Sequence, residues 1–147
     1  MFLLDTNVIS ELRHGKAAPS ATVRAWAKAQ PIHVLYLSAV TQLELEIGVL
    51  RMARRDPPQA DVLRKWLFGV LAQFDGRILP FSSLTAPHCA PLHVPDQRSF
   101  RDSMIAATAL EHGFTVVTRN EKDFEGCAVA LLNPWTDQTN RRASPSL

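Results

Sequence analysis

The chain has 147 residues, of which 46% are hydrophobic and 20% charged, and its formal net charge is +2. This length and composition are typical of one folded domain and exclude intrinsic disorder as the main state. No apolar run approaches the roughly 20 residues of a membrane span, and the small net charge is not that of a strongly basic nucleic-acid-binding protein. Asp5 interrupts the apolar start at once, and two cysteines form no disulfide framework, so we expect a cytoplasmic protein.

The chain opens with three short patterns. Residues 1–4 are an unbroken apolar run, which is typical of a strand buried on both faces of a parallel sheet. Residues 5–7, Asp-Thr-Asn, supply N-cap side chains for a short helix over 8–12. Ser20 caps a second predicted helix, which ends at residue 30 because Pro31 cannot continue it.

Two longer helices are predicted in the middle of the chain. A second buried strand over residues 34–37 precedes the first of them, which Ser38 or Thr41 caps. The second covers residues 60–74, after a break at the proline pair 57–58, and its apolar residues recur at helical intervals.

Strand and helix continue to alternate in the second half. Strands are predicted over residues 77–80, 114–117 and 128–132, and a helix over residues 101–112. Pro87 and Pro91 argue against a regular helix over residues 82–93.

This order of elements predicts an α/β fold. Alternating strands and helices form right-handed crossovers, which give a three-layer α/β/α arrangement with a mostly parallel sheet of about five strands. No linker divides the chain, so residues 1–135 are expected to form one domain. Residues 136–147 have nothing to bury and are expected to form a frayed tail.

Four acidic residues are predicted to meet at one edge of this sheet. Asp5 follows the first strand, and Glu44 lies on the helix after the second. Asp102 opens the helix over residues 101–112, and Asp123 follows the fourth strand. Open parallel sheets place their sites at the carboxyl ends of the strands. Clustered carboxylates demand a cation, and hard oxygen ligands select Mg²⁺ or Mn²⁺, which can activate water for phosphodiester hydrolysis.

Each acidic residue also has a purely structural interpretation. Asp5 can be an N-cap alone, Glu44 an exposed helical residue, and Asp102 a favourable charge in a first helical turn. Asn120 and Asp123 can simply shape a turn. Their joint placement at one sheet edge, rather than any single position, predicts a site.

Five short motifs occur in order over residues 1–135. They are LLDTN at 3–7, LELEIG at 43–48, RDSMIAATA at 101–109, TRNEKDF at 118–124 and NPW at 133–135. Together they resemble the PIN-domain family, specifically the VapC-type toxins of bacterial toxin–antitoxin modules. Each motif is weak alone, but their order and spacing make the resemblance specific. Pro87 and Pro91 depart from the family pattern, in which a helix precedes the third motif.

The resemblance implies an endoribonuclease that depends on Mg²⁺, with Mn²⁺ as a possible substitute. Its acidic set would be Asp5, Glu44, Asp102 and Asp123. Asp5 and Asp102 would be the primary metal ligands, with Glu44 and Asp123 completing the site through water or a second metal. Glu44 is preferred to Glu46 because it lies four residues before Gly48, as the motif requires. The supporting polar residues would be Thr6, Asn7, Thr118 and Asn120.

The resemblance also implies three partners: an RNA substrate, an inhibiting antitoxin protein and a second copy in a homodimer, with no membrane. Apolar positions on the two long helices, Leu43, Ile47 and Leu50 on one and residues 62–74 on the other, are available for these contacts. An antitoxin arginine could pair with the clustered carboxylates, or the antitoxin could only cover the cleft.

Other functions fit the sequence less well. The spacing of His88, Cys89 and His93 matches no common zinc site, and the chain has no P-loop. A receiver-like phosphoacceptor module would need an aspartate after the third strand, where Pro80 and Phe81 lie instead. The alternative that stays open is a non-catalytic PIN-like module that binds RNA or protein. Clustered carboxylates argue against it, since without chemistry they only cost stability.

Overall fold

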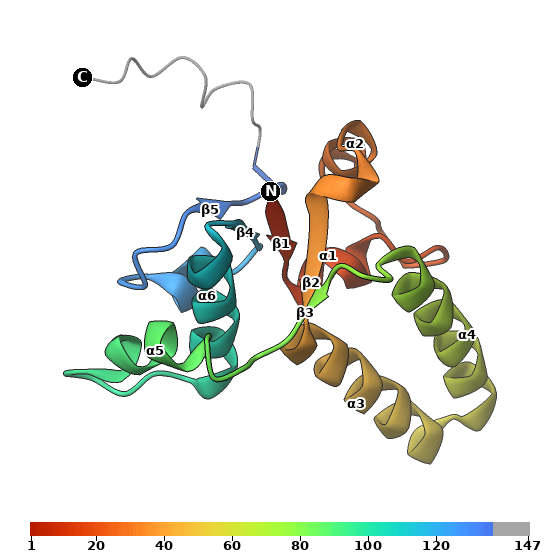
Figure 1. The fold of residues 1–147 in the computed structure, drawn as a ribbon. Helices are drawn as coiled ribbons and strands as arrows, with labels where there is room; N and C mark the ends of the chain where they lie inside the picture. Colours follow the sequence, from red (N-terminus) through yellow and green to blue (C-terminus); the bar gives the residue numbers. More distant parts are fainter. Residues whose placement is uncertain (137–147) are drawn as a thin grey trace.

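The computed structural model describes residues 1–136, which form a parallel sheet flanked by helices (Figure 1). Its five strands lie in the order β3-β2-β1-β4-β5, and every adjacent pair is parallel. The strands are β1 (Phe2–Leu4), β2 (Leu35–Ser38), β3 (Ile78–Leu79), β4 (Thr115–Val117) and β5 (Leu131–Leu132). The predicted α/β class with five strands is confirmed.

Helices connect successive strands. The α-helices are α1 (Thr6–Glu11), α2 (Ala21–Ala29), α3 (Ala39–Arg55), α4 (Pro57–Gln73), α5 (Ala86–Cys89) and α6 (Phe100–His112). Three short 3₁₀ helices are η1 (Ile32–Val34), η2 (Ala90–His93) and η3 (Glu121–Phe124). Side-chain oxygens of Ser20, Ser38 and Ser99 cap α2, α3 and α6, so Ser38 rather than Thr41 begins α3. Among residues 1–136, no helix is long and apolar enough to cross a membrane.

Both faces of the sheet are covered by apolar side chains. Leu4 and Val117 face one buried cluster, which α1, α3 and α4 complete. Leu3 and Val116, their neighbours on the same strands, face a second cluster together with Ile105 of α6. Successive residues of a strand point to opposite faces, so the unbroken apolar run at the start of the chain is explained by burial on both sides.

The start of α4 differs from the sequence-based expectation, whereas the exposed apolar positions on α3 agree with it. α4 begins at Pro57, because the first turn of a helix needs no backbone N–H donors and Asp56 caps it. On α3, the apolar side chains of Leu43, Ile47 and Leu50 are exposed, while Leu45 and Val49 enter the core. α3 and α4 lie side by side and reach away from the sheet (Figure 1).

Two further segments are shorter than their sequence patterns. The last strand covers only Leu131–Leu132 instead of 128–132, since the backbone at Gly126 and Ala128 has positive φ and turns before it. The proline-containing segment before α6 forms two short pieces, α5 and η2, as the prolines predict. Apart from Thr136, the tail predicted over residues 136–147 lies outside the described residues.

Candidate active site

Asp5 lies at the carboxyl end of the central strand β1, and its side chain is completely buried. The register pairs Leu4 with Val117, so Asp5 and Thr118 leave the sheet side by side. Thr118 Oγ1 donates to Asp5 Oδ2 at 2.8 Å, and Asn7 Nδ2 donates to the same oxygen at 3.3 Å. The Thr6 amide donates to Oδ1 at 2.7 Å, which makes Asp5 the N-cap of α1 as well as a site residue.

Glu44 and Asp102 reach the same place from two different helices. Glu44 lies on α3, and its Oε1 accepts a hydrogen bond of 2.8 Å from Thr6 Oγ1. Asp102 lies in the first turn of α6, which Ser99 caps, so the prolines of the preceding segment leave its predicted position intact.

Arg101 joins the three carboxylates. Its Nη2 donates to Asp5 Oδ1 at 2.5 Å, its Nε to Glu44 Oε2 at 2.8 Å and its Nη1 to Asp102 Oδ1 at 2.7 Å. The sequence motif contains Arg101, but nothing in its spacing indicated this position, because a residue beside an acidic one on a helix normally faces elsewhere. Its approach to Asp5 depends on how α6 packs against the sheet.

Asp123 and Asn120 complete the site from the loop after β4. They line an open cavity of about 400 Å³. The residues that line it are Thr6, Asn7, Ser10, Glu44, Arg101, Asp102, Asn120 and Asp123. The Asn120 amide donates to Thr118 Oγ1 at 3.0 Å, which ties this loop to the buried Asp5. The structure therefore brings all four predicted acidic residues and all four predicted polar residues to one region.

The surroundings of Arg101 favour the charged form of its guanidinium. Burial lowers the pKa of the guanidinium, but the hydrogen bond to Glu44, the charge of Asp5 and the hydrogen bond to Asp102 together raise it above its ordinary value. Arg101 is therefore a permanent cation among three carboxylates.

The donor set suits a hard divalent cation, because it consists of carboxylate oxygens with neighbouring hydroxyl and amide groups. A cluster of this kind requires positive charge, and in the structure Arg101 supplies it. Among residues 1–136, no three acidic, histidine or cysteine side chains stand in a geometry ready to hold a metal ion. The residues fit a metal by chemistry, and the arginine occupies the space between them.

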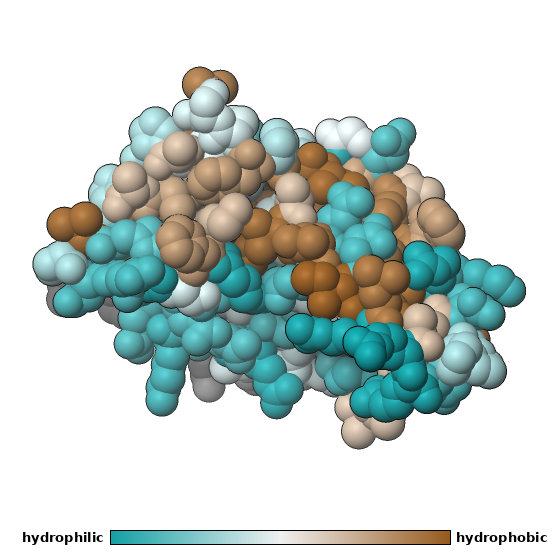
Figure 2. All heavy atoms as spheres, turned by 90° about the horizontal axis from the view of Figure 1, so that it is seen from below, coloured by the Kyte–Doolittle hydropathy of each residue, from teal (hydrophilic) through white to brown (hydrophobic). Residues whose placement is uncertain are grey.

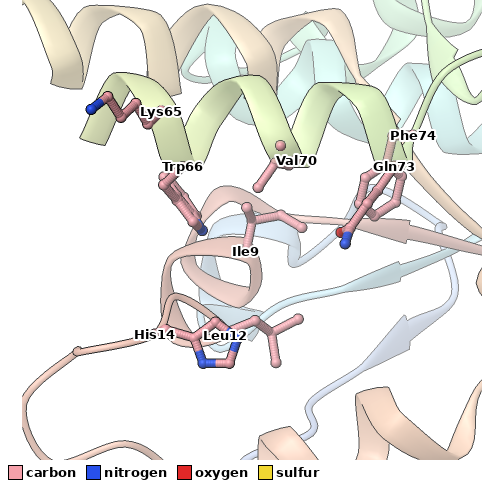
Figure 3. A pocket seen from close by; sticks show the side chains of 9 residues that line it. Ile9, Leu12, His14, Lys65, Trp66, Val70, Gln73 and Phe74 are labelled. Carbon is pink, nitrogen blue, oxygen red and sulfur yellow. The ribbon is translucent and has the colours of Figure 1, made fainter. Parts of the chain in front are cut away.

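Two apolar pockets lie next to the acidic cavity. One is about 280 Å³ and extends from Thr6 and Glu44 to Leu63 and Trp66, with Arg13 and Lys16 also lining it. The other, of similar volume, lies between α1 and α4, where Figure 3 shows Trp66 and Val70 pointing toward Ile9. Trp66 lines both pockets, so an apolar surface continues from α4 to the edge of the acidic site.

The profile of the PIN domain matches residues 2–129. The chain belongs to the PIN-domain family. This confirms the family resemblance carried by the five motifs, and the match covers every predicted site residue.

Known proteins resemble the chain over nearly its whole length. The VapC ribonuclease Y4jK of Sinorhizobium fredii is 41% identical over 141 residues, which cover 92% of this chain and 98% of that protein. A crystal structure of FitAcB from Neisseria gonorrhoeae matches with a TM-score of 0.83 and 39% identity, covering 92% of this chain and 99% of the other. A toxin–antitoxin complex from Klebsiella pneumoniae matches with a TM-score of 0.65 and 26% identity, covering 91% and 98%.

Proposed function

We propose that the protein is a metal-dependent endoribonuclease that acts as the toxin of a toxin–antitoxin module. The observation that carries this proposal is the convergence of Asp5, Glu44 and Asp102 around one point, with Asp123 on the wall of the same cavity. The similarity to a VapC ribonuclease over nearly the whole chain supports the reaction and the substrate class.

The proposed metal ligands are Asp5 and Asp102, with Glu44 and Asp123 completing the site. A bound Mg²⁺ or Mn²⁺ would polarise a phosphoryl oxygen of the RNA and lower the pKa of a bound water. The chain's own contribution is to hold the oxygens in place: Thr118 fixes Asp5 and Thr6 fixes Glu44 by hydrogen bonds of 2.8 Å each. Such positioning accounts for most of the catalysis in phosphoryl chemistry.

The proposed inhibitor is an antitoxin segment that binds the apolar pockets beside the acidic cavity. The surface around Trp66 suits the apolar face of an amphipathic helix (Figure 3). The second pocket that Trp66 lines ends at Thr6 and Glu44. A helix bound there would extend over the cavity. The similarity to a toxin in a toxin–antitoxin complex supports this partner.

The proposed homodimer uses the exposed apolar side chains of α3. Leu43 and Leu50 are 57% and 59% exposed, and Ile47 lies between them on the same helical face. Figure 2 shows apolar surface on the side of the molecule seen from below, where α3 lies in Figure 1. Exposed apolar surface of this kind is typical of protein interfaces.

The second candidate is a PIN-like module that binds RNA or protein without cleaving it, and Arg101 favours it in one respect. The argument against that module was the cost of unpaired carboxylates, and Arg101 removes this cost without any metal. Stability therefore no longer distinguishes the two functions, and cleavage has to be measured.

Sequencing of RNA ends after expression of the protein without an antitoxin tests the proposed function and identifies its target. The nuclease predicts new ends at a limited set of sites, and these ends should disappear in cells that express the Asp102→Asn variant. Identical end profiles for the wild type and the variant would favour the binding module.

A further inference from the structure

The guanidinium of Arg101 lies at the centre of the acidic site, and each of its three nitrogens donates a hydrogen bond there. Nη2, Nε and Nη1 each donate to a different carboxylate, at 2.5 Å to Asp5, 2.8 Å to Glu44 and 2.7 Å to Asp102. These carboxylates come from three separate elements, the ends or turns of β1, α3 and α6. One guanidinium therefore joins its own helix, α6, to the end of β1 and to α3, which are both distant from it in the sequence.

The Asp5 carboxylate has no acceptor position to spare. A carboxylate offers about four lone-pair positions on its two oxygens. Oδ2 accepts from Thr118 and Asn7, and Oδ1 accepts from the Thr6 amide and Arg101. A cation that binds Asp5 must therefore replace one of these four donors.

Arg101 is the donor that a cation would replace. The Thr6 amide is fixed in the first turn of α1, and Thr118 is completely buried. Asn7 is held at both ends of its amide, since Nδ2 also donates to Thr118 Oγ1 and Oδ1 accepts from the Arg119 amide. The Arg101 side chain is 30% exposed and lines the open cavity, so rotation about its own bonds can take it out of the site. Two cations on the same oxygens also repel each other strongly at such distances.

We propose that Arg101 is a resident counter-cation that competes with the divalent metal for Asp5, Glu44 and Asp102 and thereby sets the metal affinity of the site. This inference rests on the metal-dependent function proposed above. The guanidinium keeps the carboxylates together before the metal binds, and its displacement is part of every metal-binding event. The apparent affinity for the metal is therefore lower than the intrinsic affinity of the four acidic residues.

The test is the affinity of the purified full chain for Mn²⁺, measured from the electron paramagnetic resonance of free Mn²⁺ without RNA. An apparent Kd equals the intrinsic Kd divided by the fraction of open sites, so an arginine that fills about nine sites in ten weakens binding about tenfold. Arg101→Gln should therefore bind Mn²⁺ about tenfold more tightly than the wild type. Arg55→Gln is the matched control, because it removes the same charge at a different place. Arg55 lies at the end of α3, where it contacts Met52.

The outcomes separate this inference from the proposed function. An Arg101→Gln variant that binds Mn²⁺ no more tightly than the wild type overturns the competition and leaves the metal site standing. Tighter binding in both Arg101→Gln and Arg55→Gln would assign the effect to net charge and would also overturn it. If neither the wild type nor either variant binds Mn²⁺, the proposed metal-dependent function is contradicted, and so is the proposed competition by Arg101.

A second variant covers the case in which Arg101→Gln fails to fold. Arg101→Lys keeps the charge, but an ammonium group cannot span three carboxylates in the way the planar guanidinium does. Its Mn²⁺ affinity should lie between those of the wild type and the glutamine variant. In the wild type, the Arg101 Nε–H resonance should also shift when diamagnetic Mg²⁺ is added, and an unmoved resonance at saturation would contradict displacement.

Discussion

At the scale of single residues, the Asp5 carboxylate accepts hydrogen bonds from three side chains and one backbone amide. Asp5→Asn keeps the shape but replaces an acceptor oxygen by an NH₂ donor and removes the charge. We expect RNA cleavage to be lost while the fold persists, with a loss of about 1–3 kcal/mol in the free energy of unfolding. Cleavage assays and denaturant titration of the same preparation check both parts. Full Mg²⁺-dependent cleavage by a folded Asp5→Asn protein would refute the assigned role.

The choice of Glu44 over Glu46 makes a second prediction at this scale. Glu44 contacts both Arg101 and Thr6, whereas Glu46 lies two residues further along α3 and faces another direction. Glu44→Gln should reduce cleavage strongly and Glu46→Gln should leave it nearly unchanged. The reverse result, an active Glu44→Gln and an inactive Glu46→Gln, would show that the wrong helix face was chosen.

The sequence predicted the positions of the acidic residues at one sheet edge, but it did not predict the position of Arg101. Asp5, Glu44, Asp102 and Asp123 follow or open elements whose order along the chain already places them at one sheet edge. The position of a long flexible side chain depends on the rotation of α6 against the sheet, which periodicity does not define. We expected an arginine of the antitoxin to pair with these carboxylates. In the structure, an arginine of the same chain, Arg101, pairs with them.

At the scale of elements, the connection from α1 to α2 is organised by the buried carboxylate of Glu11. Glu11 accepts hydrogen bonds from Lys16 and from the Ser20 amide, the latter at 2.5 Å, and these bonds hold the pKa of Glu11 below its ordinary value. Such a group stabilises the fold above its unfolded-state pKa, and this contribution is lost as the pH falls through the lower, folded-state pKa.

Glu11→Gln tests this connection. At pH 7 we expect the substitution to lower the free energy of unfolding by about 1–3 kcal/mol, since it removes hydrogen bonds to a charged group. The difference between wild type and variant should shrink as the pH falls below 4.5, the ordinary pKa, because Glu11 then becomes neutral first in the unfolded chain and, at lower pH, in the folded protein. A difference that stays constant from neutral to acid pH in denaturant titrations would contradict the role assigned to Glu11.

Helices were predictable from the sequence where an N-cap residue and the spacing of apolar residues indicate the same element. Ser20 begins a helix as expected, and Ser38 was one of the two caps expected for α3, whereas Ser99, which caps α6, was not identified. Leu43, Ile47 and Leu50 were expected to be available for a partner and are exposed, but their helical spacing is the same as that of core residues, so the sequence left a buried alternative open. Only the packing of α3 on the sheet reveals which apolar residues enter the core.

At the scale of the whole molecule, the exposed face of α3 predicts a homodimer. Light scattering of the full chain without antitoxin, at micromolar concentration, should give twice the 16.3 kDa of one chain. Leu43→Glu and Leu50→Glu should shift the mass to that of a monomer. Ile32→Glu is the matched control, since Ile32 is 52% exposed but lies in η1, before β2 rather than after it. A wild-type protein of monomeric mass would refute the dimer.

Metal binding should also stabilise the native state as a whole. A ligand that binds only the folded protein at about 100 times its Kd adds about 2.7 kcal/mol to the free energy of unfolding. We therefore expect saturating Mg²⁺ to raise the Tm of the wild type and to have little effect on Asp102→Asn. An equal rise in both proteins would show that the stabilisation arises elsewhere on the surface.

The claim that the acidic site cleaves RNA is tested most directly by incubating purified protein, freed of any antitoxin, with cellular RNA. The proposed nuclease predicts discrete products in the presence of Mg²⁺, none after chelation with EDTA, and none with a folded Asp102→Asn variant prepared in the same way. Cleavage that persists without a divalent cation or in the variant would contradict the assigned site. Intact RNA after incubation with wild-type protein and Mg²⁺ would contradict the nuclease itself.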